Sequence, residues 1–172
     1  MLTLENATVK DVPLILQLIR ELAEYEKAAD QAVAQEEDLR RDGFSDPPKF
    51  RVIIARWSGK PAGFALYLYH YSTWLGRPTL YLEDLFVRPQ FRRLGIGRSM
   101  LIHLAKIALA EGCGRFEWQV LDWNRSAIDF YQSLGATVMK EWLTLRLTGQ
   151  ALLALAGEPD HPATDGNPGH AG

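Results

Sequence analysis

Arg92-Arg93-Leu94-Gly95-Ile96-Gly97 is the stretch of this 172-residue chain on which the predicted fold depends. It follows an apolar run at 79–87 that is typical of a strand, and it precedes residues 98–111, which have apolar positions at helical spacing. A loop between a strand and a helix aims the unpaired N–H groups of the first helical turn at one point, where the helix dipole adds positive charge. Glycines let an anion approach the backbone, so the stretch predicts a phosphate site.

Two well-known phosphate loops do not fit this stretch. A Walker A loop needs Gly-Lys followed by Ser or Thr, but Arg98 and Ser99 follow Gly97 without a lysine. A dinucleotide-binding loop needs a glycine three residues after Gly97, where Met100 stands. A plain turn with solvated arginines is the alternative that these residues alone leave open.

Strands and helices are predicted along most of the chain from the spacing of its apolar residues. Strands are predicted at 2–7, 50–56, 62–71, 79–87 and 115–121, with one or two more at 137–148, and helices at 12–27, 35–42, 98–111, 124–134 and 150–156. This order predicts an α/β fold with a mixed sheet between helices. Strand 62–71 is apolar on both faces, so we expect it at the centre of the sheet.

The composition is that of an ordinary globular protein. Hydrophobic residues make up 47% and charged residues 23%, and the length suits one domain. A net charge of -2 gives no basic footprint for nucleic acid. Residues 157–172 hold four glycines, three prolines and no large apolar residue, so we expect a domain at 1–156 and a disordered tail after it.

The expected location is the cytoplasm. The single cysteine, Cys113, excludes an internal disulfide and suits a reducing compartment. The first residues do not have the pattern of a secretory signal, and no run reaches the roughly 18 apolar residues of a membrane span.

A second motif follows the glycine loop after about thirty residues. Asn124-x-x-Ala127-x-x-Phe130-Tyr131, ending at Gly135-Ala136, predicts a helix that leads into a strand. Together with Arg92-x-x-Gly95-x-Gly97, this motif resembles the GNAT superfamily of N-acetyltransferases over about residues 2–147. Four further segments resemble the diamine (spermidine/spermine) acetyltransferase family, and two of them are most similar to its thialysine-acetylating branch. The four are Tyr25-Glu26, Tyr71-Ser72-Thr73-Trp74-x-Gly76, Tyr81-Leu82-Glu83-Asp84 and Leu121-Asp122-Trp123-Asn124.

The resemblance implies a GNAT fold, in which a mixed, mostly antiparallel sheet with helices on both faces is splayed around acetyl-CoA. It implies no metal. The backbone that would contact the pantetheine arm and the acetyl carbonyl belongs to Leu85, Phe86 and Val87. The residues that would hold the pyrophosphate are Arg92, Arg93, Leu94, Gly95, Ile96, Gly97 and Arg98. Asn124, Ser126 and Ala127 would border the pantetheine on its other side.

The implied reaction is direct attack of an amine on a thioester. A primary alkylamine has a pKa of about 10 and is mostly protonated at neutral pH, so one group must accept a proton. Glu83 matches the family's substrate-binding glutamate, which deprotonates the amine through water; a solvated carboxylate at a strand end is the alternative. Tyr131 matches the family's tyrosine, which protonates the departing CoA thiolate; core packing against Ala127 is the alternative.

The resemblance also implies residues that bind the substrate. Tyr25 and Glu26 match one such contact, although helix ends are commonly charged. Glu83 and Asp84 are adjacent on a predicted strand, so we expect their side chains on opposite faces. These carboxylates and Trp74 would bind an ammonium group by charge and by cation–π contact.

The sequence therefore predicts an acetyl-CoA-dependent N-acetyltransferase, a homodimer by family resemblance, for a small cationic amine of the thialysine, diamine or polyamine type. Ser72 and Thr73 stand where the polyamine enzymes carry an acidic residue, which disfavours long polycations. Two other functions remain open. One is acetylation of a protein N-terminus, a lysine side chain or an aminoglycoside, and the other is CoA binding without catalysis. The presence of both Tyr131 and Glu83 favours an enzyme.

Overall fold

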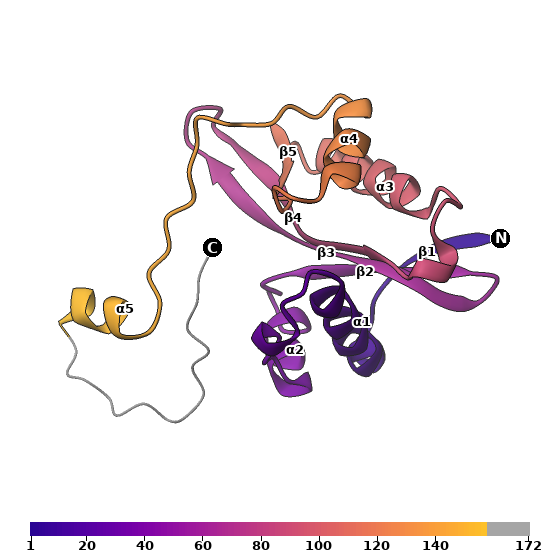
Figure 1. Ribbon diagram of the computed structural model, residues 1–172, viewed down its shortest axis with the longest axis horizontal. Coiled ribbons are helices and arrows are strands. Elements are labelled where there is room, and N and C mark those ends of the chain that lie inside the picture. Colours follow the sequence, from indigo (N-terminus) through magenta and orange to yellow (C-terminus); the bar gives the residue numbers. More distant parts are fainter. Residues whose placement is uncertain (158–172) are drawn as a thin grey trace. The chain divides into compact units, whose positions relative to one another are not determined.

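Five strands within residues 1–119 form one mixed sheet (Figure 1). Across the sheet they are β1 (Leu2–Asn6), β2 (Arg51–Trp57), β3 (Lys60–Ser72), β4 (Arg77–Val87) and β5 (Arg115–Trp118). Neighbours run antiparallel except β4 and β5, which are parallel, so the predicted mixed α/β sheet is confirmed. The computed structural model describes residues 1–157, and residues 1–119 and 120–157 form separate units.

The central strand is β3, as its apolar sequence predicts. It pairs with β2 on one edge and with β4 on the other, and every residue from Ala62 to Tyr67 is buried. Gly63 lies so close to the backbone carbonyl of Phe86 that a Cβ atom would overlap it. The glycine in this strand therefore permits close pairing with β4.

Helices cover both faces of the sheet (Figure 1). α1 (Val12–Tyr25) and α2 (Glu36–Gly43) lie on one face, and α3 (Ile96–Ala110) lies on the other. Short 3-10 turns lie at Val9–Asp11, Ala29–Gln31 and Pro89–Phe91. The buried residues of α1 form one core with alternate residues of the sheet, and this core includes Ile15, Leu18, Leu22, Ile54, Phe64, Leu66 and Phe86.

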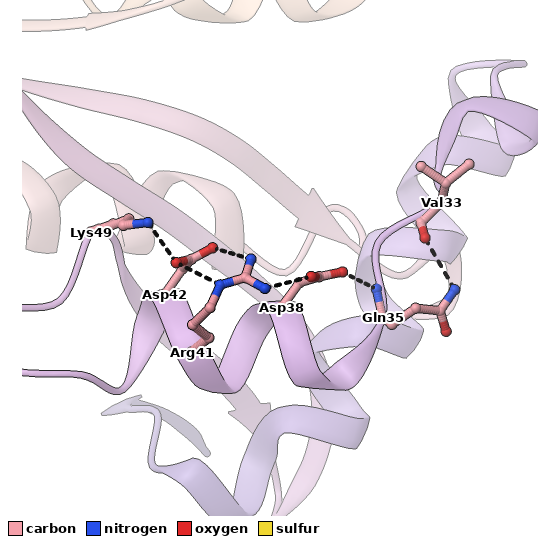
Figure 2. A network of polar contacts seen from close by, with 6 residues as sticks. All are labelled: Val33, Gln35, Asp38, Arg41, Asp42 and Lys49. Atoms are coloured by element: carbon pink, nitrogen blue, oxygen red, sulfur yellow. Dashed lines mark hydrogen bonds and ion pairs between the residues drawn. The ribbon is translucent and has the colours of Figure 1, made fainter. Parts of the chain in front are cut away.

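Surface ion pairs hold the two ends of α2 (Figure 2). The carboxylate of Asp38 accepts a hydrogen bond from the N–H of Gln35 at 2.9 Å and contacts Arg41 at 3.1 Å. Arg41 and Lys49 each approach Asp42 to 2.7 Å and lower its pKa to about 2. The last residue of α2, Gly43, leaves room for the ring of Phe50, which a Cβ atom would meet at 2.5 Å.

Residues 120–157 contain two helices, α4 (Arg125–Ser133) and α5 (Gly149–Ala156), both close to their predicted bounds. The strands predicted at 137–148 are wrong, because no residue of this range is in a strand. Their alternating apolar residues suggest a strand, but a strand needs a partner that completes its backbone hydrogen bonds. No segment of 120–157 forms such a ladder. The predicted tail lies, apart from Gly157, outside the described residues.

Arg88, directly after β4, connects the sheet to α1. Its Nε and Nη2 atoms donate to the two carboxylate oxygens of Glu21 at 2.8 and 2.7 Å, and its Nη1 atom donates to the carbonyl of Pro61 at 3.0 Å. Both side chains are half-buried, and Arg88 lowers the pKa of Glu21. A bidentate pair of this kind fixes the distance and the direction between its two partners.

We expect Glu21→Gln to lower the free energy of unfolding by about 1–3 kcal/mol, because it removes a charge-assisted pair from a half-buried site. Urea titration measures this loss. Because the pKa of Glu21 is lowered, the contribution is complete above its ordinary value of 4.5 and disappears as the pH falls through the lowered value. The difference between the variant and its parent should therefore narrow in acid.

The matched control is Glu5→Gln. Glu5 pairs with Arg56 at 3.4 Å, but its side chain is 54% exposed, so the loss should stay below about 0.5 kcal/mol. Equal losses in the two variants would show that the Glu21 pair has no special role in stability.

Candidate active site

β4 carries one residue more than β3 opposite it. Leu82 faces Tyr67 in the register and Asp84 faces Leu66, so Glu83 is the additional residue of a β-bulge. Bulges bend a strand and redirect its side chains, and they are over-represented beside active sites.

The bulge places Glu83 and Asp84 on the same face of the sheet. Asp84 is opposite Leu66, which belongs to the core beneath α1. Tyr67 follows Leu66, so its side chain points to the other face, and Leu82, which is opposite Tyr67, points there too. Glu83 follows Leu82 and therefore points back to the α1 face. The expectation that the two carboxylates lie on opposite faces is therefore wrong. It assumed strict alternation, which the bulge interrupts.

Three carboxylates meet on this face without a counter-ion. Glu26, the residue directly after α1, joins Glu83 and Asp84 from β4, and no residue of 1–119 forms an ion pair with any of them. Burial, followed by the charges of Glu83 and Glu26, raises the pKa of Asp84 to about 7. Partial burial also raises the pKa of Glu26. Such a group of carboxylates favours an incoming cation and can hold a proton near neutral pH.

The far half of β4 has an open edge within residues 1–119. β5 pairs only with Thr79–Leu82, whereas β4 continues to Val87. No strand of this unit pairs with the β5-side edge of the last five residues, which include Leu85, Phe86 and Val87. A strand edge presents alternating N–H and C=O groups, which can pair with the amides of an extended ligand.

The glycine loop follows at the end of this edge. α3 begins at Ile96, two residues before its predicted start, and Gly95 precedes it with φ +75°. Leu94 is 44% exposed, Arg93 and Arg98 are also exposed, and the buried Ile96 anchors the helix start. A Cβ atom on Gly97 would meet only the Cγ2 atom of Val87, at 3.9 Å. No protein atom requires glycine at this position, so the space above the first turn can accept a ligand.

Arg92 has a position that its predicted role does not explain. Its guanidinium group lies over the ring of Tyr25, 4.5 Å from the centroid, and its Nε atom donates to the carbonyl of Val87 at 3.0 Å. The structure thus joins a residue predicted to bind phosphate to one predicted to bind substrate. This contact links the end of α1 to the loop, and no local sequence signal points to it.

Trp74, which is also predicted to bind the substrate, lies far from the three carboxylates. Trp74 is in the turn between β3 and β4, at the end of β4 opposite Val87, and is 83% exposed. At about 3.3 Å per residue, the six steps along the strand from Arg77 to Glu83 span roughly 20 Å. Within one chain the structure does not bring Trp74 to the carboxylates.

The remaining predicted residues lie in residues 120–157. The side-chain oxygen of Asn124 accepts hydrogen bonds from the N–H of Ala127 and the hydroxyl of Ser126, both at 3.3 Å. Asn124 therefore caps α4, which also gives it a structural role. Tyr131 lies about two turns along the same helix, beside the ring of Phe130 at 5.4 Å.

Sequence reasoning missed the bulge and the two arginine contacts that follow β4. The adjacent acidic residues within an apolar strand were the only visible signal for the bulge. Within residues 1–157 no cluster of His, Cys, Asp and Glu side chains could hold a metal ion. None of the helices in that range has the length and hydrophobicity needed to span a membrane.

Known proteins resemble this chain in sequence and in fold. Residues 15–136 match the acetyltransferase (GNAT) family. The thialysine N-epsilon-acetyltransferase of Sus scrofa is 42% identical over 90% of this chain and 97% of its own length. The L-ornithine N5-acetyltransferase of Arabidopsis thaliana is 43% identical over 69% of this chain, which spans about half (49%) of that protein. An integron cassette protein from the V. cholerae mobile metagenome superposes with a TM-score of 0.76 at 31% identity, covering 90% of this chain and 97% of that one.

These findings confirm the resemblance to the thialysine-acetylating branch and the expected GNAT fold. The chain therefore belongs to the GNAT acetyltransferase family and is an acetyl-CoA-dependent N-acetyltransferase.

Proposed function

We propose that this enzyme acetylates a primary amine of a small cationic substrate, of the thialysine or diamine type. The observation that carries the proposal is the group of three carboxylates, Glu26, Glu83 and Asp84, which have no counter-ion within residues 1–119. Asp84 is half-buried, and the uncompensated charges of its two neighbours make its ionised form costly unless a cation binds there. The names of the thialysine and ornithine relatives support a substrate that carries an amine at the end of a short side chain.

Ser72 supports a short substrate. By the family resemblance, Ser72 and Thr73 stand where polyamine enzymes carry an acidic residue, and Ser72 is buried at the end of β3. Its hydroxyl accepts a hydrogen bond from the N–H of Leu75 at 3.2 Å, which closes the turn to β4. This position therefore stabilises the turn and adds no charge for a second, distant ammonium group.

Acetyl-CoA would lie along the open edge of β4 and end at the glycine loop. The thioester supplies an acetyl group on a good leaving group, the CoA thiolate. The unpaired N–H groups of the first turn of α3, together with Arg93 and Arg98, would bind the pyrophosphate. The open position at Gly97 supports this placement, because it leaves room for a phosphate against the backbone. Asn124, Ser126 and Ala127 would border the pantetheine.

Catalysis then needs one proton acceptor and one proton donor. The pair Glu83 and Asp84 would bind the ammonium group and accept its proton, a role that the family resemblance gives to Glu83. Tyr131 would protonate the CoA thiolate as the carbon–sulfur bond breaks. A thiol is a much weaker nucleophile than a thiolate, so protonation of the CoA sulfur disfavours its attack on the product and hence the reverse reaction.

We also propose that the protein has one catalytic domain, forms a homodimer and is located in the cytoplasm. The family match at 15–136 spans both units, which supports one catalytic domain over residues 1–156. A homodimer rests on the family resemblance. A cytoplasmic location rests on the lone cysteine, Cys113, a free thiol that suits a reducing compartment.

A substrate panel tests this function. Release of free CoA is measured with thialysine, ornithine, putrescine, spermine, an aminoglycoside and a peptide N-terminus under identical conditions. We expect the highest kcat/KM for the small amines with one short cationic arm. A higher value for the aminoglycoside or the peptide would contradict the proposed substrate class, and no CoA release with any amine would contradict the proposed function.

We expect Gly97→Val to abolish CoA binding and leave the protein folded. Valine costs no more than glycine in a helix, and its Cβ atom meets no protein atom closer than 3.9 Å. A ligand at a hundredfold excess over Kd stabilises a protein by about 2.7 kcal/mol, so the thermal shift with CoA should disappear. Lys106→Val, an exposed position of the same helix, is the control and should keep the shift. Full stabilisation of Gly97→Val by CoA would remove the loop from the binding site.

Tyr131→Phe should lower kcat by about 10²–10⁴-fold and leave CoA affinity unchanged, because only a proton donor is lost. Raising the pH should not restore activity, because a less acidic medium does not replace a proton donor. Tyr69→Phe removes a hydroxyl from a half-buried tyrosine of β3 and serves as the matched control. Parental turnover in Tyr131→Phe would show that another group protonates the thiolate.

A further inference from the structure

We propose that Arg115 and Glu117 of β5 bind the charged head of an amino-acid substrate whose reacting amine lies at the carboxylates of β4. The head carries an α-carboxylate and an α-ammonium group, and the aromatic pair of His70 and Tyr81 would support the carbon chain between the two ends. This inference rests on the proposed function. Within the thialysine or diamine class, it names the residues that select an amino acid over a diamine.

His70 and Tyr81 form an aromatic pair beside the three carboxylates. Tyr81 lies two residues before Glu83, so alternation points both side chains to the α1 face. His70 is opposite Thr79, which is two residues farther back on the same face. Its ring stacks on the ring of Tyr81, with centroids 4.4 Å apart and an angle of 13° between the planes. Tyr81 is half-buried and His70 is exposed, so the pair presents an apolar surface that suits the chain of a small amine.

Strand β5 adds a cation and an anion next to this pair. Glu117 is opposite Tyr81 in the parallel register of β4 and β5, so its side chain points to the same face. Arg115 is two residues earlier, opposite Thr79, and points the same way. The Nη1 atom of Arg115 lies 3.8 Å from the Oε1 atom of Glu117, which is too far for a hydrogen bond. Neither residue forms another ion pair within residues 1–119, so both charged groups are available to a ligand.

The spacing between the two sets of charges suits a short amino acid. Residues rise about 3.3 Å along a strand and neighbouring strands are about 4.8 Å apart, so the Cα atom of Glu117 lies roughly 8 Å from that of Glu83, and the Cα atom of Arg115 roughly 14 Å. The arm of thialysine or ornithine has four or five bonds of about 1.5 Å between its terminal nitrogen and the α-carbon, and it spans roughly 5–6 Å. The protein side chains cover the remaining distance. Burial, followed by the charges of Glu83 and Glu117, raises the pKa of Tyr81, which agrees with a position between these two carboxylates.

The chemistry of Arg115 and Glu117 distinguishes an amino acid from a diamine. A planar guanidinium group binds a carboxylate through two parallel N–H···O bonds. The carboxylate of Glu117 can then accept a hydrogen bond from the α-ammonium group, which is attached to the same carbon as the α-carboxylate. A diamine ends in a second ammonium group, which Glu117 attracts and Arg115 repels. The choice between the two substrates therefore depends on Arg115, whereas Glu117 serves both.

Thialysine and its decarboxylated analogue, bis(2-aminoethyl) sulfide, test the proposal because they differ only by the α-carboxylate. We expect the parent to have the higher kcat/KM for thialysine. Arg115→Gln should lower that value by about tenfold or more, mainly through KM, because a hydrogen bond to a charged group corresponds to about 10–100-fold in affinity. The kcat/KM for the analogue should stay the same or rise, because the variant removes a repulsion. Arg115→Lys keeps the charge without the planar fork and should restore part of the loss.

Two further variants separate the roles of the charges. Glu117→Gln should lower kcat/KM for both compounds, because each carries a second ammonium group. Arg51→Gln is the matched control and should change neither value. Arg51 is also an exposed arginine of the sheet, but it is opposite Tyr67 and therefore points to the α3 face.

Equal changes for the two compounds in Arg115→Gln, or a parent that prefers the analogue, would overturn the inference. Calorimetric titration at saturating CoA gives a readout that does not depend on turnover. Arg115→Gln should raise the Kd of thialysine and leave that of the analogue unchanged, and an unchanged Kd of thialysine would also overturn the inference. A parent that acetylates neither compound contradicts the proposed function, while the titration still decides whether Arg115 binds the carboxylate.

Discussion

The two strands that pair with β4 do so over different lengths, and the rest of the site depends on this difference. β3 accompanies β4 along its whole length, whereas β5 stops at Trp118, opposite Leu82. The extra residue of the bulge, Glu83, follows at once, so the strand bends where its second neighbour ends. The end of β5 leaves a backbone edge of β4 unpaired, and the bulge at the same place turns two carboxylates toward α1. Both substrates of a transfer reaction can then meet at the same strand.

An open strand edge needs support from elsewhere, and two arginines supply it. Arg88 binds Glu21 in the middle of α1, and Arg92 stacks on Tyr25 at its end. Both side chains come from the chain just after β4, so the free half of the strand is anchored to the helix on one face while α3 begins on the other. A site on anchored strands and helices holds its geometry more closely than a site on loops.

The features that could be predicted from the sequence are those that depend on residues adjacent in the chain. The central place of β3 is visible in its continuous apolar run, and the glycine loop is visible because Gly95 and Gly97 stand between a strand pattern and a helix pattern. The bulge at Glu83 was missed, because register depends on the partner strand, no glycine marks the position, and the adjacent acidic residues were the only local signal. The error at 137–148 has the same origin. Alternating residues indicate a capacity for pairing, and only a partner converts it into a strand.

The three carboxylates carry a cost that explains why they are candidates for function. Asp84 has a raised pKa in the folded protein, so its contribution to stability is complete below its ordinary value of 3.8 and is lost as the pH rises through about 7. At neutral pH the ionised form of Asp84 therefore destabilises the folded protein. Carboxylates elsewhere in the unit show the opposite arrangement: Glu21 and Asp42 pair with arginine or lysine and have lowered pKa values. Asp84 differs from these paired acids, because it is half-buried beside two other carboxylates and has no cation in residues 1–119 to offset their charge, which is why this group is a candidate for function.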